Sequence, residues 1–365
     1  MSSASSRYIA AYDGLRGLAA IIVVWFHLFE TFSQGPSVQI LNHGYLAVDF
    51  FYLLSGYILC HAYDNRWGAM SLRSFFSRRL SRLHPMIIAG SVVGLLLLAF
   101  QACPMFPLLD NAPLWKVFSV FLLGCLLIPL WPGMDIRGWD EMFCLNSPQW
   151  TMLYEYLANL AYALFLRKAG KKLLAVLAAI AAFFVADLAL NLNLLSIYGD
   201  RGAQAYTVIG GWTSTWKDVY IACVRLSFPF LAGMLLYRIK IAIHWSAGPA
   251  LATILLAAVL CSPRILPTKP LVNGIYELVS IVVLLPAVLL LGKSAPVGET
   301  CQKFCRLFGE FSFPLYLTHF PFVYLQVSLY SRFPDHATLI TAGCFLLIVT
   351  TAALFTWWLR RRKKQ

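Results

Sequence analysis

The run GLRGLAAIIVVWFHLFETF, residues 14–32, is long enough to cross a lipid bilayer as a helix. A hydrocarbon core about 30 Å thick requires about 20 residues at a rise of 1.5 Å per residue. Further apolar runs of similar length follow along the chain at about 45–62, 84–101, 115–131, 149–166, 173–190, 217–237, 247–262, 274–292, 310–330 and 337–358. The pattern predicts an all-α, polytopic membrane protein.

The composition of the whole chain supports this prediction. Of its 365 residues, 60% are hydrophobic and only 12% are charged, whereas soluble domains are about 45–50% apolar and about 25% charged. The nine cysteines include no CxxC pair and no Cys/His cluster at zinc spacing, so we expect neither a disulfide scaffold nor a metal site. We expect a short tail at 1–8, one membrane domain at 9–358 and a basic tail at 359–365.

The net charge of +13 is explained by membrane topology. Loops rich in Lys and Arg stay in the cytoplasm, and such clusters occur at 66–82, 167–172, 238–240, 293–306 and 360–364. This predicts a multi-pass protein of the plasma (bacterial inner) membrane with both termini cytoplasmic, and no nucleic-acid partner is needed. Eleven crossings cannot place both termini on one side. We therefore expect about ten transmembrane helices plus one re-entrant or interfacial segment, residues 115–131, on the outer side.

Several ionisable residues fall inside the apolar runs, where a charge is costly and usually marks a functional site. Arg16 and His27 are about 16 Å apart along one helix, so Arg16 lies near the cytoplasm and His27 in the outer half. Asp49 and Glu155 reach a similar depth to His27 in helices that start outside. A histidine beside a carboxylate is typical of a general base with its orienting partner. His27, Asp49 and Glu155 are therefore candidate catalytic residues, although sequence does not establish their contact.

The segment RRLSRLHP, residues 78–85, lies in a predicted cytoplasmic loop that leads into the third helix. Arg79 and Arg82 are one helical turn apart and would share a face, and paired guanidinium groups suit phosphate. The alternative is an ordinary cationic anchor for the next helix. Pro85 is expected in the first turn of that helix. For Asp13 and Arg16 the alternative is an N-cap and a side chain that extends to lipid phosphates.

Five segments in order resemble the membrane acyltransferase family 3. They are Asp13–Gly17 followed by His27 in an Arg-x10-His spacing, Val48–Tyr57, Arg78–Pro85, Trp150–Glu155 and Ser312–His319. Three details depart from the usual family pattern, namely Tyr57 in place of Phe, Thr151-Met152 in place of Ser-Leu, and Pro314 within the last motif. None of them removes a charged residue, so they bear on the acceptor more than on the chemistry.

The resemblance implies transfer of an acyl group, usually acetyl, from a cytoplasmic acyl-CoA to a hydroxyl of an extracytoplasmic carbohydrate. His27 is then the general base or a transient acyl carrier, and Asp49 or Glu155 orients it. The remaining assignments are Arg16, Arg79, Arg82 and His319 to acetyl-CoA or another acyl-CoA, and Trp150 and Asp13 to the acceptor. For His319 a helix–helix hydrogen bond is an equally good interpretation.

A proton-coupled transporter or flippase of a glycan or glycolipid is the alternative function. Buried Asp, Glu, His and Arg residues also mark proton and substrate pathways in membranes. Transporters are often built from two halves with matching broken helices, and the sequence has no such internal repeat. The ordered motifs therefore favour the acyltransferase.

The topology predicts the location of Gly138, which follows the non-crossing segment. A reporter enzyme fused near Gly138 should be active only on the outer side of the membrane. A cytoplasmic signal from that fusion would contradict the arrangement of ten crossings.

Overall fold

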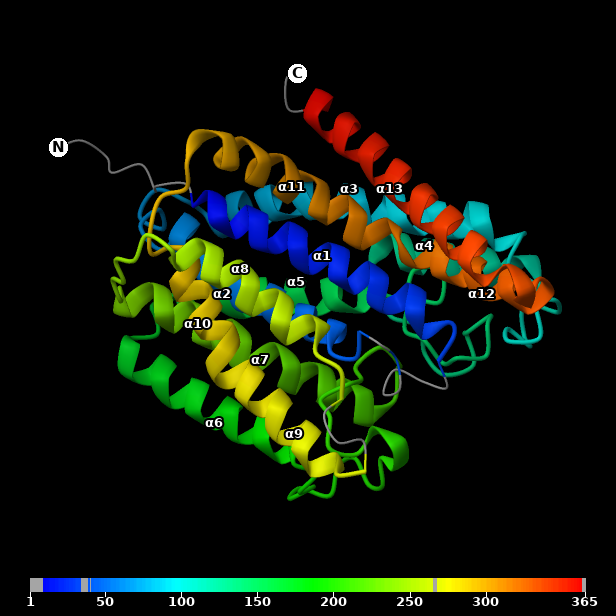
Figure 1. Cartoon of the computed structure of the whole chain (residues 1–365), viewed down its shortest axis with the longest axis horizontal. Coiled ribbons are helices and arrows are strands. Elements are labelled where there is room, and N and C mark those ends of the chain that lie inside the picture. The colour runs from blue at the N-terminus through cyan, green and yellow to red at the C-terminus, as the bar shows by residue number, and fades with distance from the viewer. Residues whose placement is uncertain (1–8, 34–38, 40, 265–267, 363–365) are drawn as a thin grey trace.

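The computed structural model describes residues 9–33, 39, 41–264 and 268–362, and these residues are mostly helical (Figure 1). The predicted all-α class is confirmed, since the described chain has no strand beyond an isolated bridge between Glu141 and Thr213. The helices are α1 (Ala10–Glu30), α2 (Ala47–Tyr63), α3 (Leu72–Leu98), α4 (Leu114–Leu126), α5 (Gln149–Leu164), α6 (Lys171–Ala189), α7 (Trp216–Ile239), α8 (Gly248–Cys261), α9 (Pro270–Val279), α10 (Leu285–Gly292), α11 (Glu299–Thr318), α12 (Phe320–Arg332) and α13 (Ala337–Arg362).

Seven described segments are long and apolar enough to cross a membrane. They are Ala10–Glu30, Gly44–Tyr63, Leu72–Leu98, Lys171–Ala189, Trp216–Ile239, Pro270–Gly292 and Pro334–Arg362. The segment Pro270–Gly292 joins α9 to α10 through a π-helix at Ser280–Leu284. The total of ten crossings and the side of the termini stay predictions. The predicted tail at 1–8 and residues 363–365 lie outside the described residues, and residues 359–362 form the last residues of α13.

The first and last helices place their terminal residues at the same end of the bundle. The Tyr12 hydroxyl near the start of α1 donates to the carbonyl of Leu289 near the end of α10, at 2.9 Å. Arg360 near the end of α13 pairs with Glu310 in the middle of α11, at 2.6 Å, and Arg16 of α1 donates to the carbonyl of the neighbouring Gly309. We call this the basic end. At the opposite end, called the loop end, Gln326 of α12 donates to the carbonyl of Leu28 near the end of α1.

Helix α4 starts at the loop end and the chain returns there after it. The Lys116 ammonium in its first turn donates to the carbonyl of Asp135, at 2.9 Å. The helix ends at Leu126 and is followed by Leu127, which adopts a left-handed conformation with φ 57°, and the chain then turns back. This geometry agrees with the predicted segment that does not cross, although its position in a bilayer stays a prediction.

Three predicted helix boundaries were wrong because they followed hydropathy alone. Helix α3 begins at Leu72, where the Ser71 side chain accepts from the Ser74 amide. The arginine segment is therefore helical, and Pro85 lies inside α3 rather than in its first turn. Helix α11 begins at Glu299, well before residue 310. His319 lies at the junction of α11 and α12 rather than inside one continuous helix.

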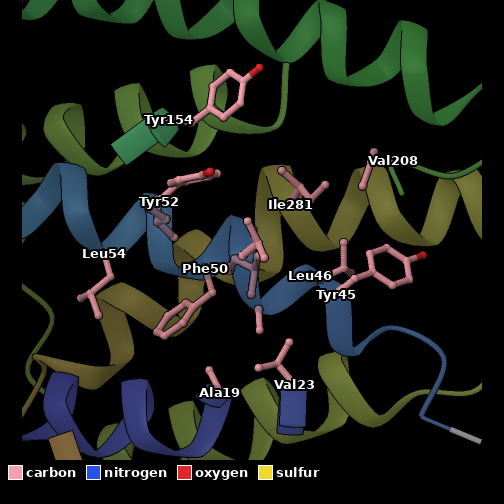
Figure 2. Close-up of a cluster of buried hydrophobic side chains, with 14 of the residues drawn as sticks. Ala19, Val23, Tyr45, Leu46, Phe50, Tyr52, Leu54, Tyr154, Val208 and Ile281 are labelled. Atoms are coloured by element: carbon pink, nitrogen blue, oxygen red, sulfur yellow. The ribbon is translucent and has the colours of Figure 1, made fainter. Parts of the chain in front are cut away.

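The helices pack closely around small residues. A Cβ atom at Gly56 of α2 would overlap the carbonyl oxygen of Phe230 in α7, so only glycine permits this approach. Figure 2 shows Ala19 and Val23 of α1 pointing toward Phe50 of α2 in the apolar core. These contacts hold α1, α2 and α7 in fixed positions beside the polar residues described below.

The Asp49–Arg225 ion pair is completely enclosed by these helices. The Arg225 guanidinium lies 2.7 Å from the Asp49 carboxylate, and the two side chains are 2% and 0% exposed. Arg225 also donates to the carbonyls of Tyr45 and Gly210. The pair therefore ties α2 and α7 to the loop that precedes α7.

We expect Arg225→Leu to destabilise the protein by about 3–5 kcal/mol, because Asp49 is left as an uncompensated buried charge. The double variant Asp49→Leu/Arg225→Leu should recover most of the lost stability, because it leaves no buried charge without a partner. Thermal unfolding of the purified variants measures both effects. A single variant as stable as the unmodified protein would contradict this assignment.

Candidate active site

A cavity of about 820 Å³ lies between α1, α2, α3, α5, α11 and α13. Along α2 it is lined from Leu59 near the basic end to Val48, eleven positions that span about 16 Å. Phe51 and Tyr316 line its deep part toward the loop end, and Ile58 and Met152 make further apolar contacts. The cavity therefore reaches from the basic end into the middle of the bundle.

The wall of the cavity is strongly basic. Among the described lining residues, three are carboxylates and six are arginines: Asp13, Glu155 and Glu310, and Arg16, Arg79, Arg82, Arg306, Arg360 and Arg362. The predicted residues Arg16, Arg79 and Arg82 are thus brought to one cavity. From sequence, Arg306, Arg360 and Arg362 indicated only topology, because their helices could not be placed beside the others.

Arg16, in the first of the five sequence motifs, contacts Ser312 at the start of the last one. Its guanidinium donates to the Gly309 carbonyl at 2.7 Å and to the Ser312 hydroxyl at 2.9 Å. It also pairs with Asp13 at 2.8 Å. Asp13 was expected to bind the acceptor, but it lies against Arg16 at the basic end, far along α1 from His27. The structure therefore gives Asp13 a place beside the arginines.

Glu155 pairs with Arg79, which corrects the expectation that it orients His27. The Arg79 guanidinium is 2.6 Å from the Glu155 carboxylate, which also accepts from the Ser55 hydroxyl at 2.7 Å. Because α3 begins early, Arg79 lies about 10 Å into α3, and Glu155 lies about 13 Å from the matching end of α5. The two side chains therefore meet at one depth. They join α2, α3 and α5 around the cavity.

The carboxylate that contacts His27 belongs to the same helix, α1. Its Nδ1 lies 2.9 Å from a carboxylate oxygen of Glu30, so neither Asp49 nor Glu155 orients it. The His27 ring stacks on His319, with centroids 5.4 Å apart. His319 is fully buried, and its Nδ1 donates to the Tyr316 carbonyl at 2.8 Å. This bond leaves Nε2 as an acceptor, and that atom has no hydrogen-bond partner among the described residues.

His27 does not line the cavity but is connected to it through two rings. Tyr316, which lines the deep part, has its ring centroid 5.9 Å from that of His319. His319 in turn contacts His27. The histidine expected from sequence to be catalytic therefore lies behind Tyr316 and His319, two ring contacts away from the deep part of the cavity.

Trp150 and Asp49 form a separate buried cluster. Trp150 is 6% exposed, and the Arg225 guanidinium lies 5.7 Å from the centre of its ring. Neither Trp150 nor Asp49 lines the large cavity, and the acceptor contact expected of Trp150 stays a prediction. Arg225 and Glu30 were not expected as site residues. Both fall inside apolar runs, so the criterion that selected Asp49 and Glu155 would have found them.

A smaller cavity of about 130 Å³ lies at the loop end. Trp131, Glu141, Ser214 and Thr215 are among the residues that line it. Burial raises the pKa of Glu141 to about 7, and the Tyr324 hydroxyl donates to its carboxylate. The cavity combines an aromatic face with hydroxyl and carboxyl groups. Among all the residues that the structure describes, no group of three or more His, Cys, Asp or Glu residues is placed to hold a metal ion.

Comparison with known proteins agrees with the motifs. A family model described as an acyltransferase domain matches residues 9–359. "Protein 2 in picA locus" of Rhizobium radiobacter is 28% identical over 190 residues, which cover 50% of this chain and 95% of that protein. The peptidoglycan O-acetyltransferase OatA of Listeria monocytogenes is 34% identical over 92 residues, 24% of this chain but only 14% of OatA. No solved structure matches the chain.

The two kinds of ion pair in the cavity should differ in their effect on stability. Glu155→Gln leaves the nearly buried Arg79 without its counter-charge and should cost about 3–5 kcal/mol. The matched control Glu310→Gln breaks the pair with Arg360, whose side chains are 42% and 32% exposed, and should cost less than about 1 kcal/mol. Thermal unfolding compares the two variants, and equal losses would contradict the proposed difference in burial.

Proposed function

This chain belongs to the acyltransferase 3 family, and on that premise we propose that it is a membrane O-acyltransferase. In this proposal it moves an acyl group, most simply acetyl, from cytoplasmic acyl-CoA to a hydroxyl of an extracytoplasmic carbohydrate. The acyltransferase class follows from the family. The donor, the acceptor, the plasma-membrane location and the residue roles are parts of the proposal.

The observation that carries the proposal is the basic cavity with an apolar interior. Its volume falls within the range of about 300–1,000 Å³ typical of small-molecule sites. CoA carries phosphate groups, which suit the arginines at the basic end. Its pantetheine arm is long and flexible, which suits the stretch along α2 from Leu59 to Val48. A thioester at the tip of that arm would arrive near Tyr316, whose ring contacts His319, and His27 lies behind His319.

His27 is the proposed base. The carboxylate of Glu30 accepts the Nδ1 hydrogen and so leaves Nε2 able to take a proton. When an acceptor hydroxyl attacks the thioester carbonyl carbon, its proton passes to Nε2, the carbon–sulfur bond breaks, and the proton then moves to the departing CoA sulfur. Glu30 stabilises the imidazolium that forms between these steps. Alternatively, His27 first takes the acyl group and then passes it to the hydroxyl.

The acceptor is proposed to approach from the loop end. His27 lies in the last turn of α1, close to that end. The smaller cavity at the same end offers Trp131 and the hydroxyls of Ser214 and Thr215, side chains of the kinds that contact sugar rings and sugar hydroxyls. OatA is named for acting on peptidoglycan, which supports a cell-surface polymer as the acceptor class.

His27→Ala should lower acyl transfer by about 100-fold or more, because general acid–base catalysis is worth about 10²–10⁴-fold. Glu30→Gln should give an intermediate loss, since it keeps the ring but removes the charge that stabilises the imidazolium. Mass spectrometry of surface glycans from cells that express each variant measures the acyl groups added.

The control is His336→Ala, which alters an exposed histidine between α12 and α13 and should leave transfer unchanged. The variants must be present in the membrane at the level of the unmodified protein. Normal glycan acylation by His27→Ala would exclude His27 as the base. Cells whose glycans carry the same acyl groups with and without the gene would argue against the O-acyltransferase itself.

A further inference from the structure

Two cysteines lie one helical turn apart near the start of α11. The sulfur atoms of Cys301 and Cys305 are 3.8 Å apart, which is the distance of a hydrogen bond between two thiols. Both are free thiols. They lie at the basic end, because Gly309, one turn further along α11, accepts from Arg16. This end is the predicted cytoplasmic side, where a disulfide is usually transient and often senses oxidants.

The two thiols differ in exposure. Cys301 is exposed, whereas Cys305 is buried. The Cys305 sulfur packs against α1, the neighbouring helix in Figure 1, since a Cβ atom at Gly14 would lie 2.8 Å from it. Burial raises the pKa of the Cys305 thiol to about 11. An oxidant that arrives from solution therefore meets Cys301 first, and Cys305 is placed to react second.

The helix geometry permits a bond between the two sulfurs only if the first turn of α11 changes shape. Residues four apart in an α-helix have Cα atoms about 6.2 Å apart, which lies within the range of about 4.4–6.8 Å found across disulfides. Their Cβ atoms are about 5–6 Å apart in a helix, whereas a disulfide requires about 3.5–4.5 Å. The backbone between the two cysteines must therefore move by a small amount.

The start of α11 can make this movement at low cost. Cys301 is the third residue of the helix, and the Gln302 amide after it donates to the Gly298 carbonyl at 2.8 Å. The amides of the first helical positions have no carbonyl partner within the helix, so few backbone bonds are lost when this turn opens. The disulfide that results is strained, and strained disulfides are the ones that are easily reduced again.

We propose that Cys301 and Cys305 form a redox-sensitive modification site that a hydroperoxide converts to a disulfide. The Cys301 sulfur attacks a peroxide oxygen, so that a sulfur–oxygen bond forms and the oxygen–oxygen bond breaks. The thiol proton passes to the departing alcohol or water. The Cys305 sulfur then attacks the resulting sulfenic acid, the sulfur–oxygen bond breaks, and its hydroxyl leaves with the Cys305 proton as water. Two thiols are thus oxidised while one peroxide is reduced.

The bond would change the contact between α11 and α1. To reach Cys301, the Cys305 sulfur has to leave its position against Gly14. The neighbours of Gly14 in α1 include Asp13 and Arg16, and both line the large cavity. The site therefore lies beside the basic end of that cavity, although its chemistry does not depend on the proposed function.

Peptide mapping tests the bond directly. Trypsin cleaves after Lys303, which lies between the two cysteines. A disulfide between them therefore links the peptides 294–303 and 304–306. We expect this linked pair after hydrogen peroxide treatment of the purified full chain in lipid nanodiscs, and its loss after reduction. The control is Cys223, an exposed cysteine of α7, whose peptide should remain unlinked.

Two variants test the order of the steps. In Cys305→Ser the second thiol is absent, so Cys301 should stop at the sulfenic acid, which dimedone captures as a stable adduct. In Cys301→Ser the buried Cys305 should remain unmodified at the same peroxide concentration. Mass spectrometry measures both modifications.

Hydrogen exchange tests the predicted movement. The backbone amides of residues 299–305 should exchange faster in the oxidised protein than in the reduced protein. Peroxide treatment of Cys301→Ser should leave their exchange unchanged.

Three results would overturn the inference. The first is Cys301 oxidised to its sulfinic acid with no linked peptides. The second is a link that joins two copies of the peptide 294–303, because the bond would then form between molecules. The third is a linked pair whose first helical turn exchanges as slowly as in the reduced protein, because the bond would then require no rearrangement of α11.

Discussion

The structure depends on the pairing of charges within a bundle that has little water to solvate them. An unpaired charge among apolar helices is expensive, so each buried arginine requires a carboxylate or carbonyl oxygens around it. Arg225 satisfies this requirement with Asp49 at 2.7 Å, and Arg79 does so with Glu155 at 2.6 Å. Because each pair joins different helices, these contacts fix the register of α2, α3, α5 and α7. The cavity takes its shape from that register.

The same need for charge pairing determines which charged residues hold the helices together and which lie beside His27. Asp49 and Glu155, expected to assist His27, instead pair with Arg225 and Arg79. The carboxylate beside His27 is Glu30, one helical turn further along α1. Structural and proposed chemical roles are thus carried by different carboxylates. At the basic end, the arginines that line the cavity outnumber the carboxylates. The net positive charge of this wall favours an anionic donor.

Much of the fold could be predicted from sequence, because apolar runs of bilayer length mark helices reliably. The all-α class and most of the helices came from this signal. The start of α3 was missed because Arg78, Arg79 and Arg82 are polar and yet good helix formers. Once α3 starts at Leu72, Arg79 reaches the depth of Glu155. Hydropathy gives depth along a helix but not rotation, so it could not show that Asp49 faces Arg225 or that His319 faces His27.

The central claim is that an acyl-CoA occupies the basic cavity with its thioester beside the paired histidines. Its most direct test is a cryo-electron microscopy structure of the full chain with a non-hydrolysable acetyl-CoA analogue. The account predicts density for the nucleotide between α3 and α13, and for the arm along α2 as far as Tyr316. Density for the analogue at another surface, with this cavity filled only by lipid or water, would contradict the account.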